Sequence, residues 1–494
     1  MIKIYLLNLI IVILLCSNCS GTKNEAAADE PYRIESIKMP EGLTSETGAL
    51  GFLPDGRLVA CFLRGEVMIF DPATGKWSLF AEGLHEPLGV LVVNKSELLV
   101  MQRAELTRIK DSDGDGKADI YETVTDDFGV TGNYHEFNYG PLKDRNDNLF
   151  IALNLASAGG NIHPEVRGRL DTSGRSEGKD MFSVVPYRGW VMKWTPDGKL
   201  LPYAMGFRSP NGLGFDKEGR LMVTDNQGDW VGTSALYHVQ EGNFYGHPAS
   251  LIWKKDWNMG NPFLLPVAAL DSMRTKAAVL FPQGIMADSP TQPLCDNTGG
   301  KFGPFGGQLL VGEMNSGRMI RVMLEEVEGQ LQGACIPLID EKGLRKGNNR
   351  IAFAPDGSLW VGQTSHGWAG DNGIQRIVFT GKKPMDVYSM QITPKGFDLT
   401  FTQPVDSSAL NPENYNFHSY YYEYHKTYGS ERMDLKANAV SHISLSDDHL
   451  KVSLELDTLQ PGYVYQLDLG DIKGKSGSSL DNRLICYTIN KLKK

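Results

Sequence analysis

The stretch DGSLWV at residues 356–361 places a short polar turn directly before a run of apolar, β-prone residues. Asp and Gly tolerate the positive φ that a tight turn requires, and the apolar run that follows is typical of a buried strand. Related patterns recur at residues 55–59, 97–100, 147–151, 218–223 and 307–311. A unit found six times, each copy too small to bury its own apolar face, predicts a six-bladed β-propeller over residues 33–383.

The pattern changes after residue 383. FDLTF at residues 397–401 and LKVSLEL at residues 450–456 alternate apolar and polar side chains, which indicates half-buried strands. We therefore expect an all-β chain in which a small Ig-like β-sandwich occupies residues 384–494. The Tyr-rich stretch at residues 420–428 has two interpretations: a packing surface against the propeller, or a platform on which a ligand stacks.

The N-terminus resembles an export signal. Lys3 precedes an apolar run over residues 4–15 that is too short to span a bilayer, and the polar residues 20–32 suit a flexible tether. We expect a signal peptide over residues 1–19, with Cys19 as the lipidated first residue of the mature chain. Plain cleavage near Ser20 is the alternative. Either way the chain is expected to be exported to the periplasm or outer membrane. If Cys19 is lipidated, the lipid anchor is expected to be the sole membrane contact.

The formal net charge is −10, and the chain has no Lys/Arg-rich run. This composition argues against a nucleic acid or an acidic membrane surface as the working partner. Beyond residue 19 the chain also lacks the C-x-x-C-H haem motif and any C-x-x-C metal pair.

The stretch DSDGDGKADIYE at residues 111–122 has the oxygen spacing of a calcium-binding loop. Crowded carboxylates repel one another unless a cation lies between them. We therefore expect Ca²⁺ to be a cofactor. The flanks read as strands, so the loop is interpreted as a structural clip on a blade. The expected ligands are the side chains of Asp111, Asp113, Asp115, Asp119 and Glu122 and the backbone carbonyl of Lys117.

Three further motifs carry polar side chains between strands: GNYHEF at residues 132–137, GFRSPNGLGF at residues 206–215, and DNQGDW at residues 225–230. His135 beside Glu136 could act as a general base, or it could be a structural hydrogen-bonding residue. EGNFYGHP at residues 241–248 completes the series.

The order of these motifs resembles the glucose/sorbosone dehydrogenase family. KFGPFG at residues 301–306 and VGQTSHGW at residues 361–368 resemble most closely a branch of secreted bacterial proteins. The resemblance covers roughly residues 43–380 and implies a pyrroloquinoline quinone (PQQ) cofactor. It implies that His135 removes the hydroxyl proton of a sugar and that Arg208 contacts the quinone. Ser209 stands where the sugar dehydrogenases carry Asn, and Tyr134 stands where they carry Asp. Without a haem motif, the electron acceptor is expected to be a separate protein.

Residues just beyond strand ends converge on the axis of a propeller. A Trp beside His and Gln is typical of a sugar site. We expect cofactor contacts from Arg208, Ser209, Arg318 and Arg350, and substrate contacts from Glu136, Asp225, Gln363, His366 and Trp368.

Three functions are compatible with these patterns. The first is a dehydrogenase acting on a sugar or polyol, with a small-molecule or oligosaccharide substrate. The second is a non-catalytic lipoprotein that binds a glycan or a partner protein. The third is a calcium-assisted hydrolase or lactonase.

Overall fold

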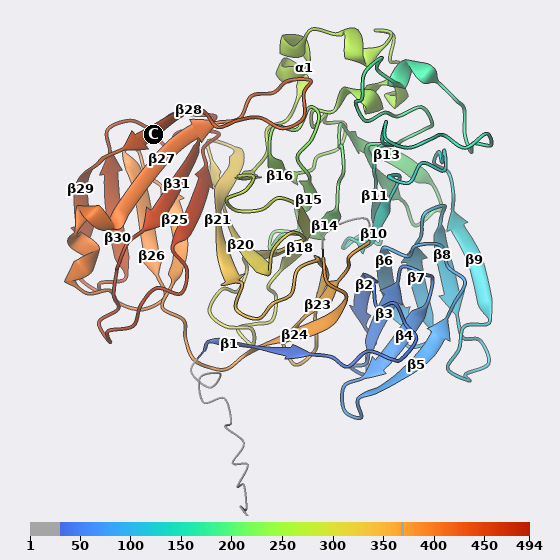
Figure 1. Cartoon of the computed structure of the whole chain (residues 1–494), viewed down its shortest axis with the longest axis horizontal. Coiled ribbons are helices and arrows are strands. Elements are labelled where there is room, and N and C mark those ends of the chain that lie inside the picture. The colour runs from blue at the N-terminus through green and yellow to red at the C-terminus, as the bar shows by residue number, and fades with distance from the viewer. Residues whose placement is uncertain (1–29, 367–369) are drawn as a thin grey trace, which may run out of the picture.

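The computed structural model describes residues 30–366 and 370–494. The described chain is almost entirely β-structure, and its larger part is a six-bladed propeller (Figure 1). The expectations for the signal peptide, Cys19 and Trp368 fall outside the described residues. Within the described residues, no helix is long and apolar enough to cross a membrane.

The blades are antiparallel sheets of four strands that follow one another along the chain. The first blade contains β2–β5 (Thr47–Phe52, Leu58–Phe62, Val67–Asp71, Lys76–Ala81), and the second contains β6–β9 (Gly89–Asn94, Glu97–Met101, Leu106–Lys110, Ile120–Thr125). The third contains β10–β13 (Asn138–Lys143, Leu149–Leu153, Trp190–Trp194, Leu200–Met205), and the fourth contains β14–β17 (Gly212–Phe215, Leu221–Asp225, Ser234–His238, Val279–Phe281). The fifth blade is β18–β21 (Pro290–Cys295, Leu309–Glu313, Arg318–Val327, Gln330–Asp340), and the sixth joins β22–β24 (Asn348–Phe353, Leu359–Gln363, Gly373–Phe379) to β1 (Tyr32–Ser36).

The six innermost strands form a closed ring. Each of β2, β6, β10, β14, β18 and β22 contacts the next, and β22 contacts β2. The N-terminal β1 closes the ring by pairing with β24, from Tyr32 opposite Phe379 to Ser36 opposite Gln375. Each strand predicted from the repeat is the second strand of its blade, which explains its continuous apolar run: β3, β11, β19 and β23 are buried along their whole length.

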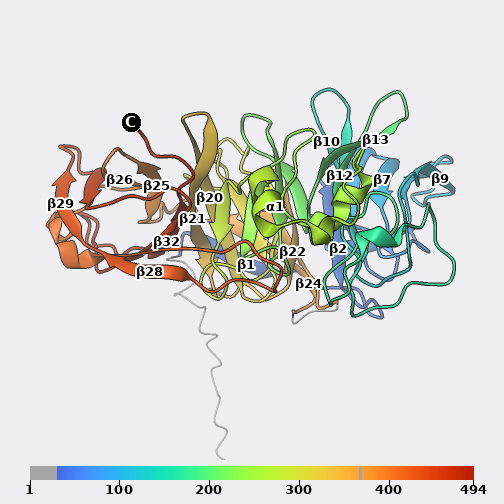
Figure 2. The ribbon, with the colours of Figure 1, turned by 90° about the horizontal axis from the view of Figure 1, so that it is seen from above.

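The C-terminal part is a two-layered sandwich (Figures 1 and 2). One layer contains β25, β26, β30 and β29, and the other contains β32, β31, β27 and β28. Their apolar faces form a common core that includes Phe397, Phe417 and Tyr487. The strands span Val387–Ile392 (β25), Gly396–Phe401 (β26), Tyr415–Tyr421 (β27), Met433–Asn438 (β28), Val440–Leu445 (β29), Lys451–Leu456 (β30), Val464–Leu469 (β31) and Leu484–Thr488 (β32).

The sandwich and the propeller share one continuous sheet, which the sequence did not indicate. β32 pairs with the outer strand β21 of the fifth blade, with Cys335 opposite Cys486. The result is an eight-stranded sheet that runs from the propeller axis into the sandwich. A buried ion pair supports the junction: Arg321 on β20 lies 3.2 Å from Asp386, just before β25. The outer edge of this blade is therefore covered, which removes an exposed strand edge.

Two long insertions lie within blades, between β11 and β12 and between β16 and β17. Their short helices contact one another beside the propeller. The helical segments of the chain are η2 (Thr172–Gly174), η3 (Pro248–Trp253), η4 (Pro262–Leu264), α1 (Val267–Met273), η5 (Ser407–Leu410) and η6 (Pro412–Asn414).

Candidate functional site

The loops that lead into the innermost strands lie at one end of the propeller, which we call the mouth. Because neighbouring strands in a blade are antiparallel, the start of each innermost strand lies beside the end of the second strand. His135 precedes β10, Arg208 precedes β14 and His366 follows β23, so all three lie at the mouth. The acidic loop joins β8 to β9, the third and fourth strands of their blade, and therefore lies at the opposite end.

Among the described residues, one ring nitrogen of His135 has a hydrogen-bond partner and the other has none. Its Nδ1 lies 3.0 Å from the carbonyl oxygen of Leu155. A carbonyl can only accept, so Nδ1 carries the proton of the neutral ring and Nε2 keeps its lone pair. Burial and the nearby charge of Arg208 lower the pKa of His135 to about 4. The ring is therefore neutral at pH 7, and Nε2 can accept a proton.

The loop around His135 is braced by buried polar side chains. The His135 backbone N–H donates to Oδ1 of Asn133, whose amide donates to the carbonyl of Ser157. Glu136, predicted to contact substrate, is buried, and both its oxygens accept hydrogen bonds from Thr131, at 2.8 Å each. The structure therefore places Glu136 as a brace beneath the loop.

Arg208 is anchored at one end of its guanidinium. Its Nε donates to Oδ1 of Asp229 at 2.8 Å. Among the described residues, no acceptor bonds to its two terminal nitrogens. Asp229 Oδ2 accepts from Nε2 of the fully buried His247 and from the backbone N–H of Met181, both at 2.8 Å. Burial alone would raise the pKa of Asp229, but His247 and Arg208 hold it well below its usual range. The terminal N–H groups of Arg208 thus remain free for a ligand.

The backbone of Arg208 is also fixed. Asp225, fully buried at the end of β15, accepts the backbone N–H of Arg208 at 2.9 Å and that of Ser209 at 2.6 Å. Burial raises the pKa of Asp225 to about 6 although these two donors lower it. The Ser209 hydroxyl accepts from the amide of Asn154 at 3.2 Å. Asp225, expected to contact substrate, therefore positions the Arg208 loop.

This arrangement recurs in other blades. Glu313, at the end of β19, accepts the backbone N–H groups of Asp288 and Ser289. Gln102, after β7, accepts the N–H of His85 at 2.7 Å. An acceptor at the end of the second strand thus fixes the loop that leads into the innermost strand.

A second charged cluster lies at the mouth beside His135. His366 Nε2 is 3.4 Å from Glu86, and its Nδ1 is 3.6 Å from Glu46. The hydrogen bond to Glu86 raises the pKa of His366. Burial opposes ionisation of Glu86, but His366 and Arg103 lower its pKa to about 2. Arg103 also donates to the backbone carbonyls of Asn133 and Tyr134, which links this cluster to the His135 loop.

Arg350 lies at the axis and connects several blades. Its Nε donates to the carbonyl of Leu88, its Nη1 donates to that of Asn211, and its guanidinium lies 4.6 Å from the centre of the Tyr139 ring. Burial lowers its pKa to about 10. It borders a small axial cavity of about 60 Å³ lined by all six innermost strands.

Two predicted residues are fully engaged elsewhere. Arg318 makes a two-pronged ion pair with Asp340 and donates to two backbone carbonyls. Gln363 is fully buried, and its amide is occupied by Asn348, Gln375 and Arg345. The polar groups of both side chains are thus hydrogen-bonded within the protein. Charged and amide groups near strand ends can find such partners in neighbouring strands of the same blade.

Several buried polar atoms at the mouth have no partner among the described residues. They include Asn154 Oδ1, Asn211 Oδ1 and Arg350 Nη2. Buried polar groups are normally hydrogen-bonded, so unpaired buried donors and acceptors indicate places for a ligand or water.

Sequence reasoning missed Asp229, His247, Glu86 and Arg103. Asp229 and His247 stand in the quoted motifs DNQGDW and EGNFYGHP, but only the fold shows that they meet at 2.8 Å. Glu86 and Arg103 lie in loops without a recognisable motif.

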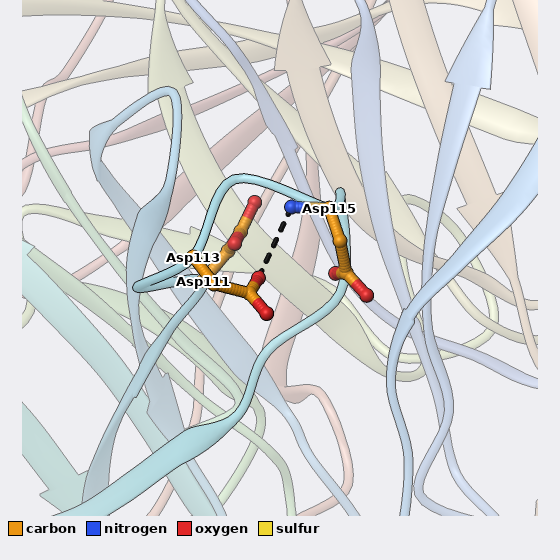
Figure 3. Close-up of side chains that lie close together, drawn as sticks. All are labelled: Asp111, Asp113 and Asp115. Carbon is orange, nitrogen blue, oxygen red and sulfur yellow. Dashed lines mark hydrogen bonds between the residues drawn. The ribbon is translucent and has the colours of Figure 1, made fainter.

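The acidic loop lies at the opposite end of the propeller from this chemistry. Carboxylate oxygens of Asp111, Asp113 and Asp115 lie within 4.8 Å of one another (Figure 3). Asp119 instead accepts from the backbone and hydroxyl of Ser112, and Glu122 pairs with Arg108 at 3.4 Å. The structure thus groups three of the expected side-chain ligands and directs the other two elsewhere.

The chain is similar to one family model and to a number of solved structures. Residues 70–260 match the model of a family described as a domain of unknown function (DUF7133). No curated protein matches the chain. Similar solved structures include an oxidoreductase (glucose dehydrogenase) from Thermus thermophilus, with 18% identity, 70% of this chain and 100% of that chain covered, and a TM-score of 0.48. The PQQ-bound aldose sugar dehydrogenase of Streptomyces coelicolor has 16% identity, coverage of 70% and 98%, and a TM-score of 0.44. The soluble aldose sugar dehydrogenase of Escherichia coli has 14% identity, coverage of 70% and 99%, and a TM-score of 0.46.

Proposed function

We propose that this chain is an exported sugar dehydrogenase that oxidises a CH–OH group at the propeller mouth. The observation that carries the proposal is His135, whose neutral ring is fixed through Nδ1 and leaves Nε2 free. A neutral, oriented imidazole nitrogen with an available lone pair is what a general base needs to remove a hydroxyl proton.

The residues at the mouth fit an anionic quinone such as PQQ. Arg208 offers two unbonded nitrogens, and Arg350 has a buried Nη2 without a partner among the described residues. Guanidinium groups suit carboxylates because they donate two parallel hydrogen bonds. Arg208 would hold the group at the mouth, and Arg350 would donate from the axis. When bound, a quinone supplies the acceptor for the hydride that leaves the substrate carbon.

The protein's own part in the reaction is proton removal. His135 Nε2 accepts the hydroxyl proton as the C–H bond gives up its electron pair as hydride, so the alcohol carbon becomes a carbonyl carbon. The low pKa of His135 partly reflects the positive charge of Arg208. An anion bound to Arg208 would offset that charge and make Nε2 a stronger base.

The hydrolase alternative draws no support from the mouth. In the part of the chain that the structure describes, the group of side chains that could hold a metal is Asp111, Asp113 and Asp115, at the opposite end of the propeller. We propose that this loop binds Ca²⁺ as a clip between β8 and β9. We also propose that Cys19 is lipidated and anchors the exported chain to a membrane.

The test of function is dye-linked oxidation of a panel of aldoses and polyols by protein reconstituted with PQQ and Ca²⁺. We expect activity in the wild type, its loss in His135→Ala, and wild-type activity in His442→Ala, an exposed histidine on β29. Reduction of the dye at equal rates by wild type and His135→Ala would contradict the proposal.

A further inference from the structure

The loop between β27 and β28 reaches from the sandwich to the propeller mouth. It spans residues 422–432 and extends from β28 toward α1 (Figure 1). Its Gly429 N–H donates to the carbonyl of Gly228 at 2.9 Å, and its Ser430 N–H donates to that of Gly232 at 2.8 Å. The loop is thus paired with the segment that carries Asp229, the residue that anchors Arg208.

Close backbone approach makes this docking specific. A Cβ on Gly232 would lie 2.8 Å from the carbonyl oxygen of Glu423, and one on Gly429 would lie 2.9 Å from the Gln227 side chain. Gly429 also has a φ of 63°. Both positions therefore favour glycine, because the two segments pack too closely to leave room for a side chain.

Tyr424 fastens the middle of the loop. Its hydroxyl donates to the carbonyl of Gly246 at 2.5 Å. Its ring lies 4.5 Å from the guanidinium carbon of Arg274 and 5.5 Å from the ring of Trp230. Of the two interpretations of the Tyr-rich stretch, packing against the propeller therefore applies to Tyr424.

Tyr428 is different, because its ring is presented to solvent. The side chain is 66% exposed although its backbone forms a bridge with Asp229. The ring centre lies 5.3 Å from the guanidinium carbon of Arg208. A loop held at several points thus keeps a large aromatic ring exposed next to Arg208, whose terminal nitrogens have no acceptor among the described residues.

We infer that Tyr428 is a specificity-determining residue that stacks on the C–H face of a saccharide ring, so that the sandwich completes the binding site of the propeller. A pyranose has an apolar face and a rim of hydroxyl groups, which match an aromatic ring beside guanidinium donors. The inference rests on the proposed function for the identity of the reaction, but saccharide binding itself requires no turnover.

Binding can therefore be measured without an activity assay. Isothermal titration of the protein with glucose, xylose, cellobiose and glucitol would compare wild type, Tyr428→Ala, Tyr428→Phe and Tyr388→Ala. Tyr388 is 38% exposed on β25 and serves as the matched control. Stacking worth about 1 kcal/mol or slightly more corresponds to an affinity loss of about five- to tenfold. We expect that loss in Tyr428→Ala, at most about a twofold change in Tyr428→Phe, and none in Tyr388→Ala.

Thermal melting would establish that Tyr428→Ala is folded, and PQQ affinity would be measured in the same variants. Weaker sugar binding with unchanged PQQ affinity supports the inference, whereas weaker PQQ binding alone assigns Tyr428 to the cofactor and overturns it. Equal sugar affinity in wild type and Tyr428→Ala, or absence of saccharide binding by the wild type, also overturns it. If the wild type binds sugars through Tyr428 but never reduces the dye, the dehydrogenase proposal fails and this inference stands.

Discussion

His135 and Leu155 are joined by a hydrogen bond from the ring Nδ1 to the carbonyl oxygen, 3.0 Å long. The backbone N–H of Leu155 in turn donates to the carbonyl of Arg208 at 3.2 Å. One residue of β11's exit loop thus sets both the tautomer of the proposed base and the position of the neighbouring arginine. His135 and Arg208 are therefore coupled by position as well as by charge.

The charge coupling predicts the titration of His135. Burial and Arg208 lower its pKa to about 4, below the ordinary value of about 6.5. Between these two values the unfolded chain binds more protons than the folded one, so this residue's contribution to stability falls as pH drops from about 6.5 to about 4. Histidine hydrogen–deuterium exchange followed by mass spectrometry should give a His135 pKa well below 6, raised in Arg208→Met. An unchanged value in that variant would contradict the coupling.

The same geometry separates catalysis from cofactor binding. Loss of a general base typically costs about 10²- to 10⁴-fold in rate, so His135→Ala should lower kcat by that order and leave quinone affinity within a few fold. Arg208→Ala should instead weaken quinone binding. Arg208→Lys should restore it partly, because an ammonium cannot donate two parallel hydrogen bonds. Steady-state kinetics and quinone titration distinguish these patterns, and a reversed pattern would exchange the two roles.

The sequence predicted those features that depend on local patterns. The turn-and-strand repeat located the second strand of each blade, because a buried central strand needs a continuous apolar run. His135 and Arg208 were singled out because they stand in the motifs GNYHEF and GFRSPNGLGF, and their roles remain predictions. The junction between β21 and β32 was missed because strand pairing across 150 residues leaves no local signal. Local sequence also could not show that Gln363 bonds to Asn348, Gln375 and Arg345, or that Arg318 pairs with Asp340.

Lipidation of Cys19 predicts a change of cell fraction. In Cys19→Ala the acylated thiol is lost, so the exported protein should move from the membrane to the soluble fraction. Fractionation and immunoblotting would measure this, with Cys61→Ala, a buried blade residue, as the control. Retention of Cys19→Ala in the membrane would point to Cys16 or to peripheral attachment.

The acidic loop predicts calcium-dependent stability. The clustered carboxylates of Asp111, Asp113 and Asp115 should bind Ca²⁺, so added Ca²⁺ should raise Tm in the wild type but not in Asp113→Ala/Asp115→Ala. Because Glu122 pairs with Arg108 outside the cluster, Glu122→Gln should keep the response. Differential scanning calorimetry with EDTA or millimolar Ca²⁺ tests both points. Identical wild-type melting in the two conditions would exclude a calcium clip.

Gly228 provides a test of the mouth in which no polar side chain is replaced. The Arg208 guanidinium lies against it, and a Cβ at this position would be 1.8 Å from Arg208 Nε and 2.0 Å from Cζ. Gly228→Ala should therefore displace the guanidinium and break its bond to Asp229, while Asp229 keeps His247 and Met181. Loss of one charge-assisted hydrogen bond should cost about 1–3 kcal/mol of folding stability. Quinone affinity should fall as in Arg208→Ala, and the pKa of His135 should rise because the positive charge has moved away.

Gly306→Ala is the matched control, since a Cβ there meets nothing within 4 Å. Chemical denaturation, quinone titration and histidine exchange measure the three effects. If Gly228→Ala kept both the quinone affinity and the His135 pKa of the wild type, Arg208 would neither bind the cofactor nor lower the pKa of His135.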